Sequence, residues 1–321
     1  MSRRVDRALA ALVLGAAALW FLPAGWGSYG TYVLTLWLVT AVAAMGLNLT
    51  LGYAGQVSLA QAAFLGIGAY ATAILTRVGV PWWAAFLAAG AGCFAVGVLL
   101  GFPALRVRHH YLAFVTLAFA TIVWLAIRNE QWLTGGAFGL ANVPRPTVLG
   151  VRLDQALSFH RFVVVVALGL ALAMWWLVRS PWGRAFQALR ENPLRAASLG
   201  VDIRAYTLLA FAIGSAYGGF AGALYAPLVE FVDPAPFALS ASLMLLLMVI
   251  AGGSGYILGP FLGTLLGVAL PEWLRFAGSA YLIVFAAVVI LLLVVSPQGL
   301  PGLAERIGRA LARRRGRPRR A

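Results

Sequence analysis

Long, continuous apolar runs are the feature that most limits the fold of this chain. They follow one another along most of the sequence, and they are unbroken rather than alternating between apolar and polar residues. With 62% hydrophobic and 10% charged residues among 321, a soluble domain could not bury so much apolar surface. In lipid only helices and closed barrels satisfy their own backbone hydrogen bonds, and unbroken runs favour helices. We therefore expect an all-α, polytopic bundle of transmembrane helices.

The apolar runs predict about ten spans within one transmembrane domain, residues 1–321. The expected segments are 8–22, 29–51, 52–75, 80–102, 111–127, 161–178, 205–226, 238–251, 261–270 and 281–295. The first run follows three arginines and has an alternative interpretation as a secretory signal peptide. We favour a retained span, because every later segment also belongs in a membrane. The basic tail, 304–321, either binds anionic lipid headgroups or simply sets the orientation of the chain.

The positive charges indicate which side of the membrane each loop occupies. All 24 basic residues are arginines, and the net charge is +15. With both termini in the cytoplasm, most arginines fall on the cytoplasmic side. The arginines at or near the outer boundary are those at 77, 128, 145, 152, 161 and 275. This is the bias of the positive-inside rule, so we attribute the basic charge to membrane orientation rather than to nucleic acid.

A polar, charge-dense segment at 179–204 interrupts the apolar chain. It holds five arginines and two acidic residues between two apolar runs. The residue before a proline is pushed out of the helical region, so Asn192-Pro193 is expected to separate short helices at 182–189 and 194–199. Gly200 is expected to close the second helix. Two short helices suggest docking onto another protein, although an ordinary basic loop remains an alternative.

Two glycine-rich interruptions, 52–68 and 252–263, lie in apolar surroundings, one in each half of the chain. The first also contains polar side chains, which need partners in lipid. Broken or re-entrant helices lining a translocation path would explain both features, and close helix packing through small residues is the alternative. The candidate path residues are Gly52, Gly55, Gln56, Ser58, Gln61, Gly66, Gly252, Gly253, Ser254 and Gly255.

These regions together resemble branched-chain amino-acid permeases of the LivM type, which are subunits of ABC importers. The resemblance rests on Gly-Tyr-x-Gly-Gln-x-Ser-Leu at 52–59, on Gly-Gly-x-Gly and Gly-Pro-x-x-Gly within 252–263, and on the loop that begins Gly183-Arg184 and ends Leu199-Gly200. Ala60-Gln61 departs from the Gly-His that the family often has. A Leu-Thr-Gly-Gly run at 133–136 also resembles the family's outer loop, expected either to receive a binding protein or to cap the pore mouth.

The resemblance implies a permease subunit that carries leucine, isoleucine and valine across the bacterial inner membrane. The implied partners are a second related permease, two ATPase subunits and a soluble binding protein, besides membrane lipid. Segment 179–204 would be the cytoplasmic coupling loop. Its implied ATPase-coupling residues are Gly183, Arg184, Glu191, Asn192, Ala196, Leu199 and Gly200.

Missing motifs limit the chemistry that the chain can perform. It contains no phosphate-binding loop and no lysine, so it is not expected to be the ATPase itself. The adjacent His109 and His110 lack nearby carboxylates or thiolates, and Cys93 is the only cysteine. We therefore expect no enzyme activity, cofactor, metal or disulfide. The alternatives are a related importer for urea or short amides, and a membrane enzyme or sensor that is not coupled to an ATPase.

Overall fold

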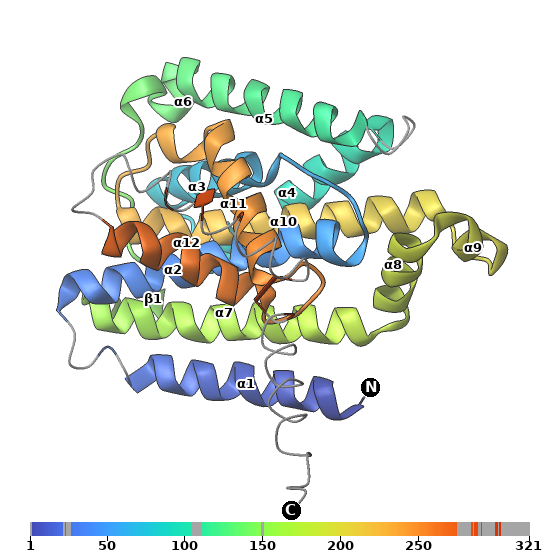
Figure 1. The fold of residues 1–321 in the computed structure, drawn as a ribbon. Helices are drawn as coiled ribbons and strands as arrows, with labels where there is room; N and C mark the ends of the chain where they lie inside the picture. Colours follow the sequence, from blue (N-terminus) through green and yellow to red (C-terminus); the bar gives the residue numbers. More distant parts are fainter. Residues whose placement is uncertain are drawn as a thin grey trace, which may run out of the picture.

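The described chain is a bundle of long helices that run side by side (Figure 1). The structure is a computed structural model that describes residues 2–274 except 22, 24–26, 105–110 and 149–150, together with 284, 286, 287, 290, 299, 300 and 302. The expected helical architecture is confirmed. One small exception is an antiparallel pair of two-residue strands, β1 (Thr147–Val148) and β2 (Val151–Arg152).

The helices differ in length and regularity. The longer ones are α1 (Ser2–Phe21), α2 (Ser28–Leu47), α3 (Gln61–Arg77), α4 (Trp82–Ala104), α5 (Tyr111–Asn129), α7 (Ala156–Arg179), α8 (Pro181–Glu191), α10 (Ile203–Val229), α11 (Leu239–Gly252) and α12 (Gly259–Trp273). The shorter ones are the π-helix η2 (Asn48–Tyr53), α6 (Gln131–Thr134), η3 (Gly136–Phe138), α9 (Pro193–Ser198) and η4 (Ala235–Phe237).

Five helical stretches are long and apolar enough to cross a membrane: Ser28–Tyr53, Trp82–Pro103, Leu112–Asn129, Ala156–Arg179 and Ile203–Val229. Two shorter apolar helices are Leu9–Phe21 and Leu239–Gly252. Most of the expected span at 281–295, the basic tail at 304–321 and the histidine pair at 109–110 lie outside the described residues. A multi-pass membrane protein is therefore supported, and the number of about ten spans stays a prediction.

Helix α10 lies at the centre of the bundle and packs against α2, α3 and α4 (Figure 1). Its buried glycines let these neighbours approach closely. A Cβ atom added at Gly218 would lie 2.7 Å from the Phe64 Cβ, and one at Gly222 would lie 2.5 Å from the backbone nitrogen of Ala69. Small residues are what allow helix backbones to come this near. Small residues on α10 therefore bring α3 into close contact with it.

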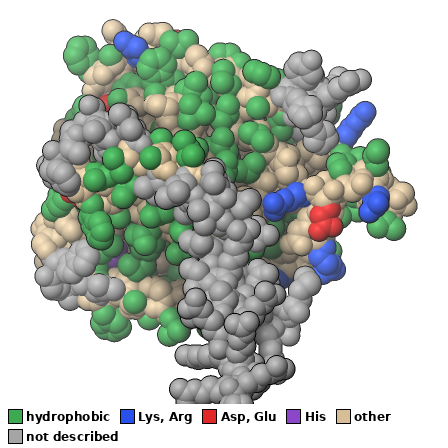
Figure 2. All heavy atoms as spheres, viewed as in Figure 1, with side chains coloured by type: hydrophobic (Ala, Val, Ile, Leu, Met, Phe, Trp, Pro, Cys, Tyr) green, Lys and Arg blue, Asp and Glu red, His purple; other side chains and the backbone are tan. Residues whose placement is uncertain are grey.

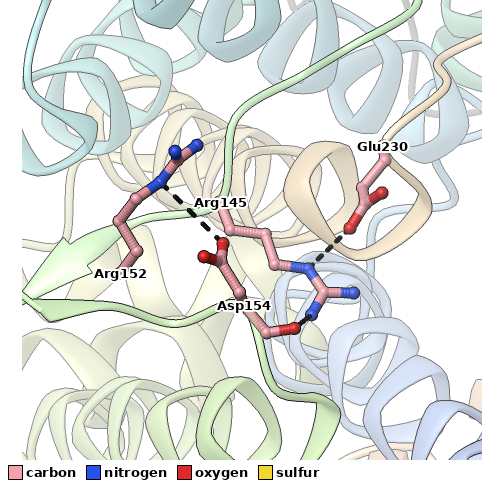
Figure 3. A network of polar contacts seen from close by, with 4 residues as sticks. All are labelled: Arg145, Arg152, Asp154 and Glu230. Atoms are coloured by element: carbon pink, nitrogen blue, oxygen red, sulfur yellow. Dashed lines mark hydrogen bonds and ion pairs between the residues drawn. The ribbon is translucent and has the colours of Figure 1, made fainter.

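The connection between α5 and α7 is fastened to the turn that follows α10. Leu140 and Val232 exchange two backbone hydrogen bonds of 2.8 and 2.9 Å. Arg145 forms a 2.7 Å ion pair with Glu230 and donates to the backbone carbonyl of Asp154, as Figure 3 shows. Segments far apart in the sequence therefore close this end of the bundle together.

Helix α7 begins at Ala156, before the expected start at residue 161. The expected span at 161–178 left His160 just outside it, but the residue is fully buried within α7. Its Nδ1 lies 2.8 Å from the Thr35 hydroxyl, and its Nε2 lies 3.1 Å from the Leu19 carbonyl oxygen. Because both ring nitrogens find partners on neighbouring helices, a polar side chain is accommodated where the sequence indicated a loop.

We expect Gly222→Ala to destabilise the bundle by about 1–3 kcal/mol, because overpacking a backbone contact cannot be relieved by a rotamer change. The measurement is the thermal unfolding midpoint of the chain in detergent micelles. Gly92→Ala on α4 is the control, since a Cβ atom there would meet nothing within 4 Å. Equal midpoints for the two variants would contradict the close packing of α3 on α10.

Candidate functional site

The backbone leaves regular α-helix between α2 and α3. The π-helix η2 is followed by an irregular stretch at 54–60 in which Gly55 has a φ of +71°. Two N–H groups at its end have side-chain partners: Leu59 donates to the Thr116 hydroxyl of α5 at 3.0 Å, and Ala60 donates to the Ser58 hydroxyl at 3.3 Å. The interruption is therefore accommodated without leaving these donors unpaired.

The polar side chains of this interruption are buried against protein. Gln56 donates to the Thr207 carbonyl at 3.1 Å, and Gln61 donates to the carbonyls of Ala43 and Gly214 at 2.8 and 3.2 Å. Both amides thus tether the start of α3 to α10, and Gln61 also reaches α2. The Gln56 side-chain oxygen has no hydrogen-bond partner among the described residues. That oxygen is therefore a buried acceptor without a donor among the described residues.

The second interruption is the turn between α11 and α12. Gly253 and Gly255 have φ values of +99° and +85°, a region that side chains rarely adopt. The two helices also meet closely here, because a Cβ atom at Gly252 would lie 2.7 Å from the backbone nitrogen of Gly263. This turn is therefore specified by backbone conformation and by helix contact together.

The two interruptions touch each other through Asn48. Its side-chain oxygen accepts a 2.8 Å hydrogen bond from the Gly255 N–H, and its side-chain nitrogen donates to the Tyr256 carbonyl at 2.9 Å. A Cβ atom at Gly52 would lie 3.0 Å from the Gly255 Cα. Asn48 is 3% exposed and was not among the predicted site residues. An amide inside an apolar run was the signal that could have identified it.

We call this contact the glycine junction and define it as Asn48, Gly52, Gly55, Gly255 and Tyr256. The structure does not bring all predicted path residues to it. Gln56 and Ser58 follow it along the chain, and Gln61 faces α2 and α10. Gly66 lies elsewhere on α3, where an added Cβ would be 3.0 Å from the Phe237 ring.

Helices α8 and α9 have well-defined ends, and the prediction of two short helices is confirmed. The Ser180 hydroxyl accepts from the N–H groups of Trp182 and Gly183, and the Asn192 side chain accepts from the Arg195 N–H. Both are N-terminal caps of the type that Ser and Asn favour. Gly200 ends α9 with a φ of +86°.

The end of α9 is a Schellman motif. The Val201 N–H donates to the Ala196 carbonyl at 3.1 Å, and the Gly200 N–H donates to the Ala197 carbonyl at 3.0 Å. These bonds require a left-handed residue at position 200, and a Cβ atom there would meet nothing within 4 Å. Backbone conformation, and not space, therefore explains the glycine.

Helices α8 and α9 project from one end of the bundle, the end at which α1 begins (Figure 1). Charged side chains gather there, whereas hydrophobic side chains cover much of the remaining described surface in this view (Figure 2). Leu194 and Leu199 are 80% and 83% exposed. Of the predicted coupling residues, Arg184, Glu191 and Leu199 are exposed, whereas Gly183 and Ala196 are buried and Asn192 and Gly200 shape the turns.

Arg190 in the last turn of α8 was not predicted, yet it connects this projection to the glycine junction. Its guanidinium donates to the Gly52 carbonyl. Arg190 lies 138 residues after Gly52 in the sequence, so local sequence patterns carried no signal for the contact. Among the described residues, no three His, Cys, Asp or Glu side chains are grouped so that they could hold a metal ion.

Comparison with known proteins gives a consistent match. A family model described as "Branched-chain amino acid transport system / permease component" matches residues 30–296. The high-affinity branched-chain amino acid transport system permease protein LivM of Escherichia coli (strain K12) is 34% identical over 292 residues, covering 84% of this chain and 69% of that protein.

More distant relatives are also transport proteins. A probable branched-chain amino acid transport permease protein LivM of Methanocaldococcus jannaschii is 27% identical, over 70% of this chain and 69% of that protein. The autoinducer 2 import system permease protein LsrC of Salmonella paratyphi B is 28% identical, over 46% of this chain and 42% of that protein. No solved structure matches the chain.

We expect Asn48→Leu to lower the stability of the bundle by about 1–3 kcal/mol, because it leaves the Gly255 N–H and the Tyr256 carbonyl without their partner. The effect should fall toward the lower end, since both residues are half-buried and water can replace part of the interaction. Thermal unfolding in detergent is the measurement, and Asn129→Leu at the exposed end of α5 is the control. An unchanged midpoint for Asn48→Leu would argue against the glycine junction.

Proposed function

Because the chain belongs to the family of branched-chain amino acid transport permeases, we propose that it is the permease subunit of an ATP-driven ABC importer for leucine, isoleucine and valine. The observation that carries this proposal is the match over residues 30–296 to permeases named for these amino acids. The family is a transport component and not an enzyme, so ATP hydrolysis belongs to separate subunits.

The proposed arrangement is a single permease domain, residues 1–321, in the bacterial inner membrane. It has about ten spans: the five long stretches, the shorter helices α1, α3, α11 and α12, and segment 281–295. With both termini in the cytoplasm, α2 and α11 run inward and α8 and α9 lie on the cytoplasmic side. The distribution of arginines supports this orientation.

In the proposed complex, α8 and α9 contact an ATPase subunit. The support is their projection from the bundle, the exposed Leu194 and Leu199, and the charged side chains around them. The remaining partners are a second related permease, a second ATPase subunit, a soluble binding protein that docks on the opposite end, and membrane lipid.

The translocation path is proposed to run beside the two interruptions, 52–68 and 252–263. Paired interruptions in the two halves of a transporter are a typical sign of its substrate path. Their direct contact at the glycine junction supports this placement. Because the junction lies at the ends of α2 and α11, the proposed orientation puts it at the cytoplasmic mouth of the path.

The direct test is reconstitution in liposomes. The purified chain alone should neither hydrolyse ATP nor accumulate leucine, because it has no nucleotide-binding loop to supply energy. Together with its partner subunits and binding protein it should accumulate leucine, isoleucine or valine when ATP is present.

Two outcomes would change the proposal in different ways. Concentrative uptake driven by a proton gradient, with no ATPase present, would overturn the importer-subunit function. ATP-dependent uptake of urea but not of leucine would keep the architecture and replace the substrate.

Substitutions at Gly200 test the role of α9. Gly200→Val should uncouple ATP hydrolysis from uptake by distorting the Schellman motif, because a β-branched residue resists a φ of +86°. Gly200→Asn should retain more uptake, since asparagine tolerates the left-handed region better than other side chains. The measurement is the amount of leucine taken up per ATP hydrolysed in the complex. Wild-type coupling in Gly200→Val would count against an ATPase contact at α9.

A further inference from the structure

We propose that Arg190 is a positioning residue that transmits displacement of α8 to the glycine junction, and so to the cytoplasmic mouth of the path. The inference rests on the proposed transport function and adds a specific residue to it. Arg190 joins the projecting helix α8 to both glycine-rich interruptions, through Gly52 and Gly55 of the first and Gly255 of the second.

The side chain of Arg190 runs along three glycines. A Cβ atom added at Gly55 would lie 3.3 Å from both Cα and Cγ of Arg190, so the stem of the side chain packs against that residue. The guanidinium donates to the Gly52 carbonyl, and a Cβ atom at Gly255 would overlap its Nη1. The absence of side chains at Gly55 and Gly255 therefore makes room for Arg190, whereas a side chain at Gly52 would meet Asn48 and Gly255.

The chemistry of this site favours an arginine. Gly52 lies near the end of η2, where carbonyl groups lack donors from a following helical turn and carry partial negative charge. A guanidinium supplies both the missing donor and a positive charge, because it is always charged and presents several N–H groups in a fixed plane. It can hold the Gly52 carbonyl while lying against Gly255, which a smaller ammonium head does less well.

The helix that carries Arg190 is packed into the bundle, whereas two of the residues that Arg190 contacts are glycines with positive φ. On the same helix, Phe186 is fully buried and packs edge-on against Tyr206, with ring centroids 6.2 Å apart. In contrast, Gly55 and Gly255 both occupy backbone conformations that glycine leaves and enters easily. A movement of α8 would thus carry the guanidinium with it and act on the more adaptable junction.

The experiment uses the complete transport complex and two substitutions. Arg190→Met keeps a long stem against Gly55 but removes the donors, so we expect uptake per ATP hydrolysed to fall about tenfold, a usual size for coupling between sites. Arg190→Lys, which keeps a charged donor, should recover part of the loss. Arg77→Met, at an exposed arginine in the last turn of α3 and outside the coupling loop, removes the same charge and should keep coupling near the wild-type level.

A second readout separates transmission from a structural role. Ser254→Cys in a Cys93→Ala background places one thiol in the half-buried turn beside the junction. Its labelling rate with a water-soluble maleimide should differ between nucleotide-free and ATP-trapped complexes. Arg190→Met should abolish that difference while subunit assembly and ATP hydrolysis persist.

The outcomes distinguish this inference from the function on which it rests. A wild-type complex without ATP-dependent uptake would overturn the proposed function itself. If the wild type transports, unchanged coupling in Arg190→Met, or a labelling difference that survives it, would overturn the role of Arg190. If Arg190→Met abolished subunit assembly, ATP hydrolysis and uptake together, the proposed role would also be overturned. Arg190 would then be needed only for the folded structure.

Discussion

The structure depends on one constraint: inside a membrane every backbone N–H and C=O must find a partner within the protein. Helices meet this condition by themselves, whereas the interruptions after α2 and α11 do not. They are accommodated because side chains from elsewhere supply the missing partners. Asn48 pairs with the backbone of the second interruption, Thr116 accepts from the first, and the Ser242 hydroxyl accepts from the Ala62 N–H at 3.0 Å.

Helix α10 contributes to these hydrogen bonds because it packs closely against α2 and α3. Its glycine face lets α2 and α3 approach backbone to backbone, so the amides of Gln56 and Gln61 reach carbonyls on α10. Because α10 also follows directly from α9, the same helix relates the position of the projecting segment to that of the interruptions. The close packing of α10 therefore also sets the geometry of the interruptions.

The two ends of the bundle are closed in different ways. At one end, the connection before α7 is joined to the turn after α10 by a backbone bridge and by Arg145 (Figure 3). At the other, α8 meets the glycine junction through one arginine, and the junction itself is joined by one asparagine. A connection made by few side chains between flexible glycines is easier to rearrange than a backbone bridge, which suits the end that we propose faces the ATPase.

The sequence by itself determined the features that depend on neighbouring residues. Apolar runs predict helices, Asn192-Pro193 separates α8 from α9, and Gly200 ends α9, because each follows from local backbone preferences and solvent. Contacts between distant segments could not be predicted in this way. The pairing of Asn48 with Gly255, the reach of Arg190 to Gly52, and the burial of His160 within α7 were decided only by the tertiary structure. Each requires two helices remote in sequence to be placed side by side, and that placement depends on how complete helix surfaces fit together rather than on any one residue's neighbours.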